Sequence, residues 1–319
     1  MKNMEKFTFV ILNYQSTNET VECIKCILKQ RYKEKNIVVV DNDSCDGENL
    51  FNEIKKVFHE EENIFLLKSN CNGGYAKGNN IGIDYAKNKL KSDFVCIINP
   101  DITILSGNFI EKSINLFKKH EYTLLGPEIM SHGININPLG GYHESVFRCI
   151  YAVLDNIRIY YTKKLRLKRF NPFKRKKTSD CKAVIFSNEE NNTKDETYIL
   201  NKNMKKQLSG ACLIFSPLFL KEFSGFCKDT FLYCEESILA FVLYNLGYKV
   251  MYSSELKTAH KGGVSLKNTN QDEDQIRMAM SKSGAWSCIV EAKVFSKRRD
   301  PIYLKNCLNP VSLSYKEIG

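Results

Sequence analysis

Short apolar runs alternate with amphipathic segments through the first third of the chain. The runs have the length and continuity of strands that are buried on both faces of a parallel sheet. They lie at Phe7–Leu12, Ile37–Val40, Ile64–Leu67 and Phe94–Ile98. Between them, apolar residues recur at helical spacing, as at Phe51, Ile54, Val57 and Phe58. Strands that alternate with helices through short loops predict an α/β fold with a doubly wound parallel sheet.

Polar residues follow three of these four predicted strands. They are Asn13-Tyr14, Asp41-Asn42-Asp43-Ser44 and Asn99-Pro100-Asp101. The carboxyl ends of parallel strands meet at one edge of a sheet, where ligands bind, so one crevice could collect all three groups. No G-x-x-x-x-G-K-[ST] motif is present, and no G-x-G-x-x-G follows the first strand. A nucleotide would therefore need side chains and a metal ion to hold it.

Asp101 is the first candidate metal ligand. Pro100 cannot donate a hydrogen bond to a sheet, so the strand should stop there and leave Asp101 just past its carboxyl end. A carboxylate in this place can hold a divalent cation, which in turn can hold a diphosphate. The alternative is a turn in which Asp101 caps a helix over Ile110–Lys118.

The strand and helix pattern is lost from about Gly140 to Lys206 and then returns. The returning pattern predicts, in order, a strand at Leu208–Phe215, a helix from Pro217, an aromatic strand at Phe231–Cys234, a helix from Glu235 to Gly247, a strand from Tyr248, and a long amphipathic helix over Asp272–Phe295.

Glu235, Glu236 and His260 are the candidate catalytic and binding groups of the second half. Two adjacent carboxylates at a helix start are favoured by the helix dipole, so they could form only a charged first turn. Alternatively, one of them is a general base whose pKa is raised beside its neighbour. A lone histidine is more often structural than a ligand, but His260 stands with glycines after a strand. A second metal or phosphate contact is therefore an option.

Composition narrows the class of protein. The chain has 319 residues, a net charge of +11 and 12 cysteines. No segment approaches the roughly 20 apolar residues of a membrane-spanning helix, and the polar N-terminus does not resemble a signal peptide. We therefore expect a cytoplasmic protein with reduced thiols. No second cysteine pair stands at zinc-site spacing from Cys23 and Cys26, so we interpret these two as packed or surface thiols.

A basic segment at Arg158–Lys177 contains ten lysines and arginines and no acidic residue. Aromatic and aliphatic residues are interleaved with them, as at Tyr160, Tyr161 and Phe170. Such a segment can lie on an anionic membrane surface or meet an anionic acceptor. Nucleic acid is a less favoured partner, and a solvated insertion with no partner is the remaining interpretation.

The order of the motifs resembles that of family 2 inverting glycosyltransferases, and in particular their rhamnosyltransferase-like branch. The first half supplies Ile11–Tyr14, Val39–Gly47, Asn72–Asn80 and Asn99–Asp101, and the second half supplies Ser209–Ala211, Gly225-Phe226, Phe231–Glu236, Gly247–Lys249 and His260–Ser265. The resemblance covers roughly residues 7–136 and 205–266. Each motif is short, but their order and spacing together are specific.

This resemblance implies a GT-A type fold, with a Rossmann-like, mostly parallel central sheet flanked by helices, and a nucleoside diphosphate sugar as donor, with UDP or dTDP as the expected nucleotide. Asp41 would contact the base, and Tyr14 and Asn72 would line its pocket. Asn99 and Asp101 stand where the family has a D-x-D motif, so Asp101 would be the main protein ligand of Mg²⁺ or Mn²⁺. His260 would lie near the metal and diphosphate.

The same resemblance makes Glu236 the catalytic base and Glu235 its support. Glu236 would deprotonate an acceptor hydroxyl, giving inversion in one displacement. Many relatives have a further acid where this chain has Ile238, and often Asp-Glu where it has Cys227-Lys228. Lys77 replaces a small residue and could reach the diphosphate.

These observations predict four regions and a function. The regions are a nucleotide-sugar half (1–136), an irregular basic insertion (137–206), an acceptor half (207–266) and a helical extension (267–319). The expected function is sugar transfer to a lipid-linked saccharide in cell-surface polysaccharide synthesis, with peripheral contact at the inner face of the cell membrane. The alternatives are a nucleotide-sugar-binding protein with a degenerate acceptor site and a sugar nucleotidyltransferase.

Overall fold

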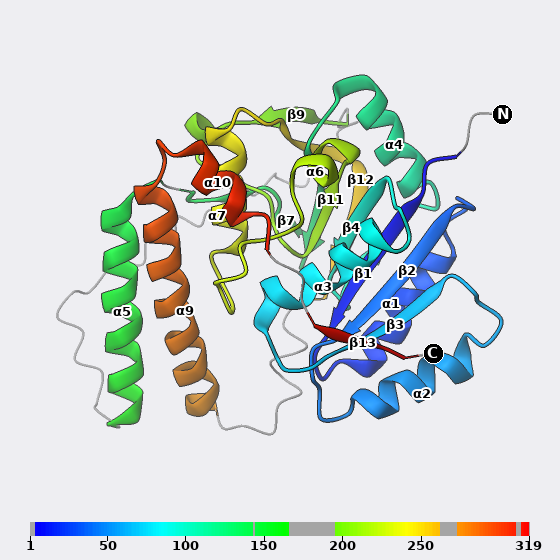
Figure 1. The fold of residues 1–319 in the computed structure, drawn as a ribbon, viewed down its shortest axis with the longest axis horizontal. Coiled ribbons are helices and arrows are strands. Elements are labelled where there is room, and N and C mark those ends of the chain that lie inside the picture. The colour runs from blue at the N-terminus through cyan, green and yellow to red at the C-terminus, as the bar shows by residue number, and fades with distance from the viewer. Residues whose placement is uncertain (1–3, 143, 166–194, 262–272, 311–313, 319) are drawn as a thin grey trace.

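The computed structural model describes residues 4–142, 144–165, 195–261, 273–310 and 314–318. A large sheet lies at the centre of the molecule, and two long helices, α5 and α9, stand side by side at one end (Figure 1). The elements of the first half are β1 Phe7–Asn13, α1 Thr17–Leu28, β2 Lys35–Asp41, α2 Gly47–Val57, β3 Ile64–Ser69, α3 Gly74–Asn88, β4 Phe94–Ile98, β5 Ile102–Ile104, α4 Phe109–His120, β6 Leu124–Ser131, β7 Ile134–Asn135 and β8 Leu139–Gly140. Those of the second half are α5 Val146–Lys164, β9 Thr197–Leu200, a 3₁₀ turn at Lys202–Met204, β10 Lys206–Gln207, β11 Cys212–Phe215, α6 Pro217–Glu222, α7 Glu235–Asn245, β12 Val250–His260, α9 Glu273–Ser296, α10 Pro301–Cys307 and β13 Tyr315–Glu317.

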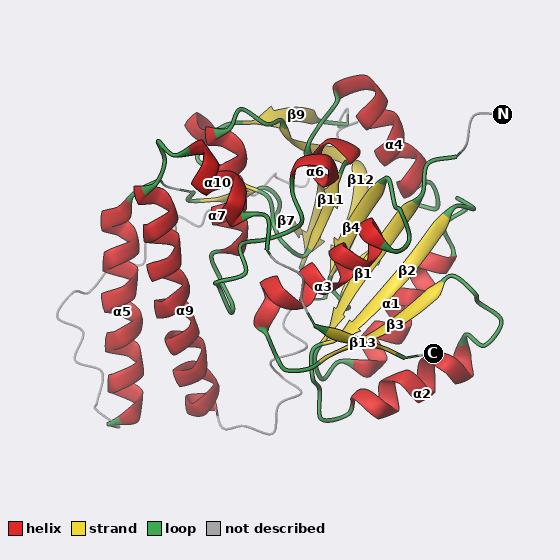
Figure 2. Ribbon diagram, viewed as in Figure 1, coloured by secondary structure: helices red, strands yellow, loops and turns green. Residues whose placement is uncertain are grey.

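The central sheet has the strand order β13-β3-β2-β1-β4-β11-β6-β12-β5, with β7 and β9 attached to β6 and β12 (Figure 2). The four strands predicted from the apolar runs, β1 to β4, are its parallel half. The expected α/β fold is therefore confirmed, and the carboxyl ends of these four strands share one edge.

Strand β11 runs antiparallel to β4, with Cys212 opposite Ile98 and Phe215 opposite Val95. The residues just before β11 therefore lie at the carboxyl end of β4, which is the ligand edge. The amide of Asn99 donates a hydrogen bond to the carbonyl of Ala211 at 2.9 Å and fixes this meeting. An antiparallel strand in this place brings a loop from the second half of the chain to the edge formed by the first half.

Side chains on the sheet alternate between two apolar cores, as the pleat of a strand requires. Phe7, Phe9 and Ile11 belong to the core that also includes Ile24 of α1 and Phe109 of α4, and all five are fully buried. The opposite faces of the same strands meet α3, α6 and α7. Both faces of the parallel half are covered, which explains why its strands are continuous apolar runs.

Residues 137–206, expected to be irregular, contain the long helix α5 (Val146–Lys164), so that part of the expectation was wrong. The helix packs along α9, the predicted C-terminal helix, which is confirmed at Glu273–Ser296. One face of α5 packs against α9, while large apolar side chains on another face of the helix are exposed. Residues 166–177 of the predicted basic segment lie outside the described residues. Among the described helices, none is long and apolar enough to cross a membrane.

The segment Phe231–Cys234 is a loop, so the predicted aromatic strand was wrong. Tyr233 and Cys234 have φ values of 74° and 68°, in the left-handed region that no strand can accommodate. Helix α9 holds the loop through its Ser287 hydroxyl, which donates to the carbonyl of Leu232 at 2.9 Å. The loop therefore ends in a sharp turn that starts α7 at Glu235.

Gly74 at the start of α3 packs against this same loop. Its φ is +79°, and a Cβ there would lie 2.0 Å from the carbonyl oxygen of Phe231. The next amide, that of Tyr75, donates to that carbonyl at 2.8 Å. The glycine turn predicted from the sequence is thus a contact between the two halves of the chain.

We expect Gly74→Ala to destabilise the protein by more than the roughly 1 kcal/mol typical of alanine at a positive φ, because the new methyl group also collides with Phe231. Urea unfolding measures the loss. Gly141→Ala is the matched control, since Gly141 has φ +84° but open space around its Cβ position. Equal losses for the two variants would show that the close approach at Phe231 is unimportant.

Candidate active site

The ends of β1 and β2 form one wall of the site. The carboxylate of Asp41 is fully buried and accepts hydrogen bonds from Asn13 Nδ2 at 2.9 Å and from the amide of Ser44 at 3.1 Å. A Cβ at Gly47 would lie 2.5 Å from Asp41 Oδ2, so a glycine is needed there for the carboxylate to fit. Asp41 is buried under the loop that follows β2 and holds it to β1, whereas Tyr14, just after β1, is half-buried.

Asn72 and Asn42 fix the glycine turn to the end of β2. Asn42 Nδ2 donates to Asn72 Oδ1 at 3.0 Å, and the same oxygen accepts the amide of Gly74 at 3.0 Å. Asn42 Oδ1 accepts the amide of Gly73 at 3.2 Å. Asn72 thus lies beside the loop that follows β2. Lys77 lies in the first turn of α3 with its side chain exposed.

Asp101 and His260 lie together, although 159 positions separate them in the chain. Strands β5 and β12 pair antiparallel with His260 opposite Ile102, and the amide of Lys261 donates to the carbonyl of Asp101 at 3.1 Å. This places His260 Nε2 3.1 Å from Asp101 Oδ2. Asp101 does not cap α4, whose N-cap is Asn108.

A bulge in β12 sets the position of His260. Ser253 pairs with Pro127 of β6 and Lys257 with Glu128, so three residues of β12, Ser254 to Leu256, have no partner in β6. Beyond the bulge the ladder resumes and carries β12 to His260.

The Asp101–His260 pair fits a divalent cation. One carboxylate oxygen and one imidazole nitrogen are ligands that Mn²⁺ accepts, while Mg²⁺ prefers oxygen. Both side chains retain some exposure, 12% for Asp101 and 18% for His260. Phosphate oxygens and water could therefore supply the remaining ligands of such an ion.

Glu236 faces the same region from the start of α7. Its Oε1 accepts the amide of Gly210 at 3.1 Å, and the Tyr75 hydroxyl donates to the carbonyl of Gly210 at 2.6 Å. A Cβ at Gly210 would lie 2.6 Å from Glu236 Oε1, so only glycine allows this approach. The next residue, Ala211, accepts the amide of Asn99 through its carbonyl. The loop before β11 therefore contacts Glu236 through Gly210 and the end of β4 through Ala211.

The two glutamates differ in their surroundings. Glu235 is 2% exposed, and its Oε1 has no hydrogen-bond partner among the described residues. Burial, followed by the negative charge of Glu236, holds the pKa of Glu235 well above its usual range. Burial also raises the pKa of Glu236, while amide hydrogen bonds, including the one from Gly210, partly offset that rise. Glu236 is the partly exposed member of the pair, which suits a group that exchanges protons with a ligand.

Ile238, which replaces an acid found in many relatives, is fully buried in the core on the α7 side of the sheet. Its side chain packs with apolar neighbours rather than lining the site. The Gly225-Phe226 motif has a structural role too, because Asn80 holds it by two hydrogen bonds. The Phe226 amide donates to Asn80 Oδ1 at 2.7 Å, and Asn80 Nδ2 donates to the Phe226 carbonyl at 2.9 Å.

Sequence reasoning gave no role to Asn42 or Tyr75, although both stand inside the quoted motifs. Polar side chains beside glycines could have indicated such a role, because the backbone amides of a glycine turn need hydrogen-bond acceptors. Of the predicted site residues, the structure brings Asp101 into contact with His260. It also brings Glu236 to the loop before β11, whose Ala211 accepts the amide of Asn99.

Comparisons with known proteins identify the family and the fold. Residues 8–189 match the family described as Glycosyl transferase family 2. The low-salt glycan biosynthesis hexosyltransferase Agl10 of Haloferax volcanii is 27% identical over 148 residues, which cover 46% of this chain and 44% of Agl10. Glycosyltransferase GlyG of Streptococcus pneumoniae is 32% identical over 108 residues, 34% of this chain and 33% of GlyG. The matched parts thus span less than half of either relative.

Solved structures share the fold at low sequence identity. TarS 1-349 of S. aureus has a TM-score of 0.52 at 14% identity, covering 92% of this chain and 73% of TarS 1-349. GalNAc-T7, solved with UDP, GalNAc and Mn²⁺, has a TM-score of 0.55 at 12% identity, covering 84% and 47%. The mannosyltransferase PcManGT of Pyrobaculum calidifontis, solved with GDP-Man and Mn²⁺, has a TM-score of 0.51 at 10% identity, covering 97% and 77%. The expected GT-A type fold is confirmed. Because the family match extends over more than half of the chain, this protein belongs to glycosyl transferase family 2.

Proposed function

We propose that this protein is a metal-dependent, inverting glycosyltransferase. It moves a sugar from a nucleoside diphosphate sugar to a hydroxyl of a saccharide acceptor in glycan synthesis. The observation that carries the proposal is the meeting at one sheet edge of a general-base candidate, Glu236, and a cation-binding pair, Asp101 and His260. A backbone hydrogen bond between Asn99 and Ala211 links the two. Asn99 lies two residues before Asp101, and Ala211 follows Gly210, which contacts Glu236.

The donor lies along the ends of β1, β2 and β4. Tyr14 and Asn72 line the base pocket, and Asp41 shapes it by holding the loop that follows β2. Asp101 and His260 would hold Mg²⁺ or Mn²⁺, and the ion would offset the charge that builds up on the leaving diphosphate. Lys77, exposed in the first turn of α3, adds a positive charge on this side. The Mn²⁺ complexes of GalNAc-T7 and PcManGT support the choice of a divalent ion.

The acceptor reacts at Glu236. Its carboxylate takes the proton of the acceptor hydroxyl while that oxygen forms a bond to the anomeric carbon. The bond from this carbon to the diphosphate breaks on the opposite face, so one displacement inverts the configuration. Glu235 lies beside the base, and its burial, followed by the charge of Glu236, raises its pKa, so it binds a proton more readily than an exposed carboxylate does.

Two other functions remain as rivals. A nucleotide-sugar-binding protein with a degenerate acceptor site would bind donor without turnover. A sugar nucleotidyltransferase would need a glycine-rich basic loop after β1, and Asn13–Asn18 contains neither glycine nor a basic residue. The intact Glu236–Gly210 contact favours the transferase over both.

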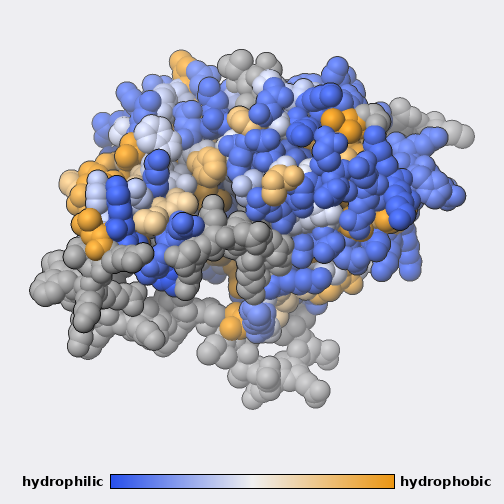
Figure 3. Space-filling view, turned by 90° about the horizontal axis from the view of Figure 1, so that it is seen from below, coloured by the Kyte–Doolittle hydropathy of each residue, from blue (hydrophilic) through white to orange (hydrophobic). Residues whose placement is uncertain are grey.

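A lipid-linked acceptor would bring the protein to the inner face of the cell membrane, and α5 offers a surface for that contact. Large apolar side chains repeat at helical spacing along one exposed face of α5, and Figure 3 shows hydrophobic groups at this end of the molecule. They are Phe147, Ile150, Leu154, Ile157, Tyr161 and Leu165. Lys163 at the end of α5 is paired with Asp274, but the exposed Lys164 and the basic residues that follow in the sequence suit an anionic surface.

The donor site is tested by thermal shift with UDP, dTDP, GDP, CDP and NAD, each with and without Mn²⁺. One nucleoside diphosphate at 100 times its Kd should stabilise the protein by about 2.7 kcal/mol in the presence of Mn²⁺. Asp101→Ala should abolish this stabilisation. Asp93→Ala, at the opposite end of β4, is the control and should keep it. Absence of a response to every nucleotide would overturn the proposal.

Turnover tests the role of Glu236. We expect Glu236→Gln to lower kcat about 10²- to 10⁴-fold, because general-base catalysis contributes that much, while the thermal shift with donor stays unchanged. Release of the nucleoside diphosphate in the presence of a lipid-linked saccharide fraction is the measurement. Glu48→Gln, an exposed acid on α2, should match the wild type. Unchanged turnover in Glu236→Gln would remove Glu236 from the mechanism.

Vesicle cosedimentation tests the α5 surface. Phe147→Ser with Leu154→Ser should weaken binding to anionic vesicles at least tenfold, since each large apolar side chain contributes about 1.5–3 kcal/mol when buried. Ile302→Ser, an equally exposed apolar site on α10, is the control. If the double variant binds as tightly as that control, α5 is not the membrane contact.

A further inference from the structure

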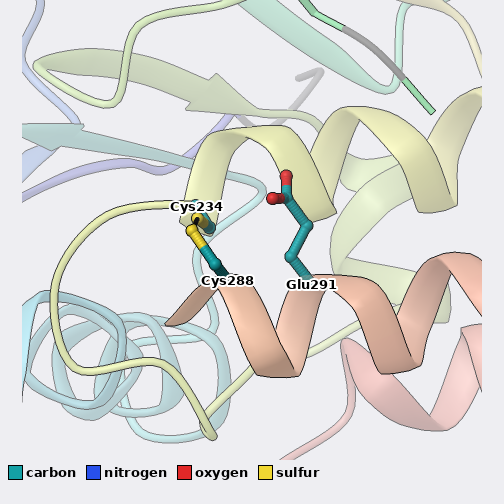
Figure 4. Close-up of side chains that lie close together, drawn as sticks. All are labelled: Cys234, Cys288 and Glu291. Atoms are coloured by element: carbon teal, nitrogen blue, oxygen red, sulfur yellow. Dashed lines mark hydrogen bonds between the residues drawn. The ribbon is translucent and has the colours of Figure 1, made fainter. Parts of the chain in front are cut away.

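A second group of potential metal ligands lies where the start of α7 packs against α9, directly before Glu235 and Glu236 in the chain. It consists of Cys234, Cys288 and Glu291, and one ligand atom from each lies within 4.8 Å of the others. Cys234 precedes the first turn of α7, and Cys288 and Glu291 are three residues apart on α9, so they share one face of that helix. Figure 4 shows the two sulfur atoms together and the carboxylate reaching from α9 towards α7.

The distances match those of a tetrahedral thiolate site. The Sγ atoms of Cys234 and Cys288 are 3.8 Å apart. Two sulfur ligands at about 2.3 Å from a tetrahedral zinc ion are separated by about 3.8 Å. The buried Cys149 of α5 lies outside this group of mutually close ligand atoms, and its Sγ donates a hydrogen bond to Glu291 Oε2 at 3.4 Å. Cys149 therefore orients the carboxylate from outside the set of ligands.

Two neighbouring thiols alone would not indicate a metal. Cys96 and Cys212 are also 3.8 Å apart, but they face each other inside the sheet as a fully buried pair. Among the described residues, Cys234, Cys288 and Glu291 form the one group in which a third ligand joins the sulfurs. The partly buried carboxylate of Glu291, set between Cys149 and the sulfur pair, is what distinguishes this cluster.

We propose that Cys234, Cys288 and Glu291 form a zinc site, with Cys149 holding the Glu291 carboxylate in place. Thiolate sulfur favours zinc over Mg²⁺ or Mn²⁺, and a water molecule would complete a tetrahedral set of four ligands. On binding, the two thiols release their protons to solvent, and the ion offsets two of the three negative charges of the sulfurs and the carboxylate. This inference does not depend on the proposed function, because it concerns residues outside the donor and acceptor sites.

The zinc would join α9 to the turn that starts α7, and α5 would contact the site through the hydrogen bond from Cys149 to Glu291. Cys149 lies on α5, Cys288 and Glu291 on α9, and Cys234 directly precedes Glu235. The loop before Cys234 is already tied to α9, since Trp286 Nε1 donates to the Asp229 carbonyl at 2.8 Å. The ion would hold the left-handed turn at Cys234 and so fix the start of α7.

Metal content tests the proposal. The full chain is purified under reducing conditions, exposed to Zn²⁺, dialysed and analysed by mass spectrometry of the elements. One zinc per chain should remain, and Co²⁺ in its place should give the charge-transfer absorption of thiolate ligands. Cys288→Ser and Glu291→Gln should each lower zinc retention at least tenfold, and Cys149→Ser should weaken it measurably. Zinc should also raise the melting temperature of the wild type.

Two controls separate this site from others. Cys307→Ser removes a thiol from a neighbouring pair with Cys227 and should retain zinc. Asp101→Ala removes the other candidate cation site and should also retain it. Zinc retention equal in wild type and Cys288→Ser, cobalt spectra without thiolate absorption, or a Cys234–Cys288 disulfide found in place of the metal would each overturn the proposal. None of these readouts depends on glycosyl transfer.

Discussion

The hydrogen bond from the Gly210 amide to the Glu236 carboxylate is the contact on which the candidate site depends. It requires a glycine, because a Cβ would lie 2.6 Å from the carboxylate oxygen. It also requires β11 to run antiparallel to β4, since only then does the residue before β11 reach the ligand edge. Burial raises the pKa of Glu236, and the backbone amides of Glu236 itself and of Gly210 offset part of that rise, so the Gly210 contact positions the carboxylate and also contributes to its proton affinity.

The parallel half of the fold and the Asp101 edge could be predicted from the sequence. Strands buried on both faces leave continuous apolar runs, and the polar residues after β1, β2 and β4 then fall at one edge because parallel strands share a direction. His260 was assigned beside the metal by resemblance, and the β5–β12 ladder accounts for the meeting with Asp101. The residue roles at this edge stay predictions until donor binding is measured.

Three features could not be predicted from local patterns. The direction of β11 depends on how the chain returns to the sheet, and a short apolar run is the same in either direction. Helix α5 has an exposed apolar face, so its period does not mark a buried side. The aromatic run before α7 has strand-like composition, but close packing against Gly74 and α9 turns it into a loop with left-handed Tyr233 and Cys234. In each case tertiary contacts outweigh local preference.

The position of His260 depends on the number of residues in the bulge of β12 more than on which side chains they carry. Three residues leave the β6 ladder between Ser253 and Lys257. Successive side chains of a strand point to opposite faces, so the parity of this number decides which face His260 presents. Substitutions at Ser254 or Glu255 leave that parity intact, whereas a one-residue insertion or deletion that shifted the ladder beyond the bulge would turn the imidazole away from Asp101. Both residues are also held in place, because the Ser254 hydroxyl accepts the Glu196 amide at 2.7 Å and the Glu255 carbonyl accepts Lys112 Nζ at 3.0 Å. The bend therefore fixes the imidazole through its length as well as through these contacts.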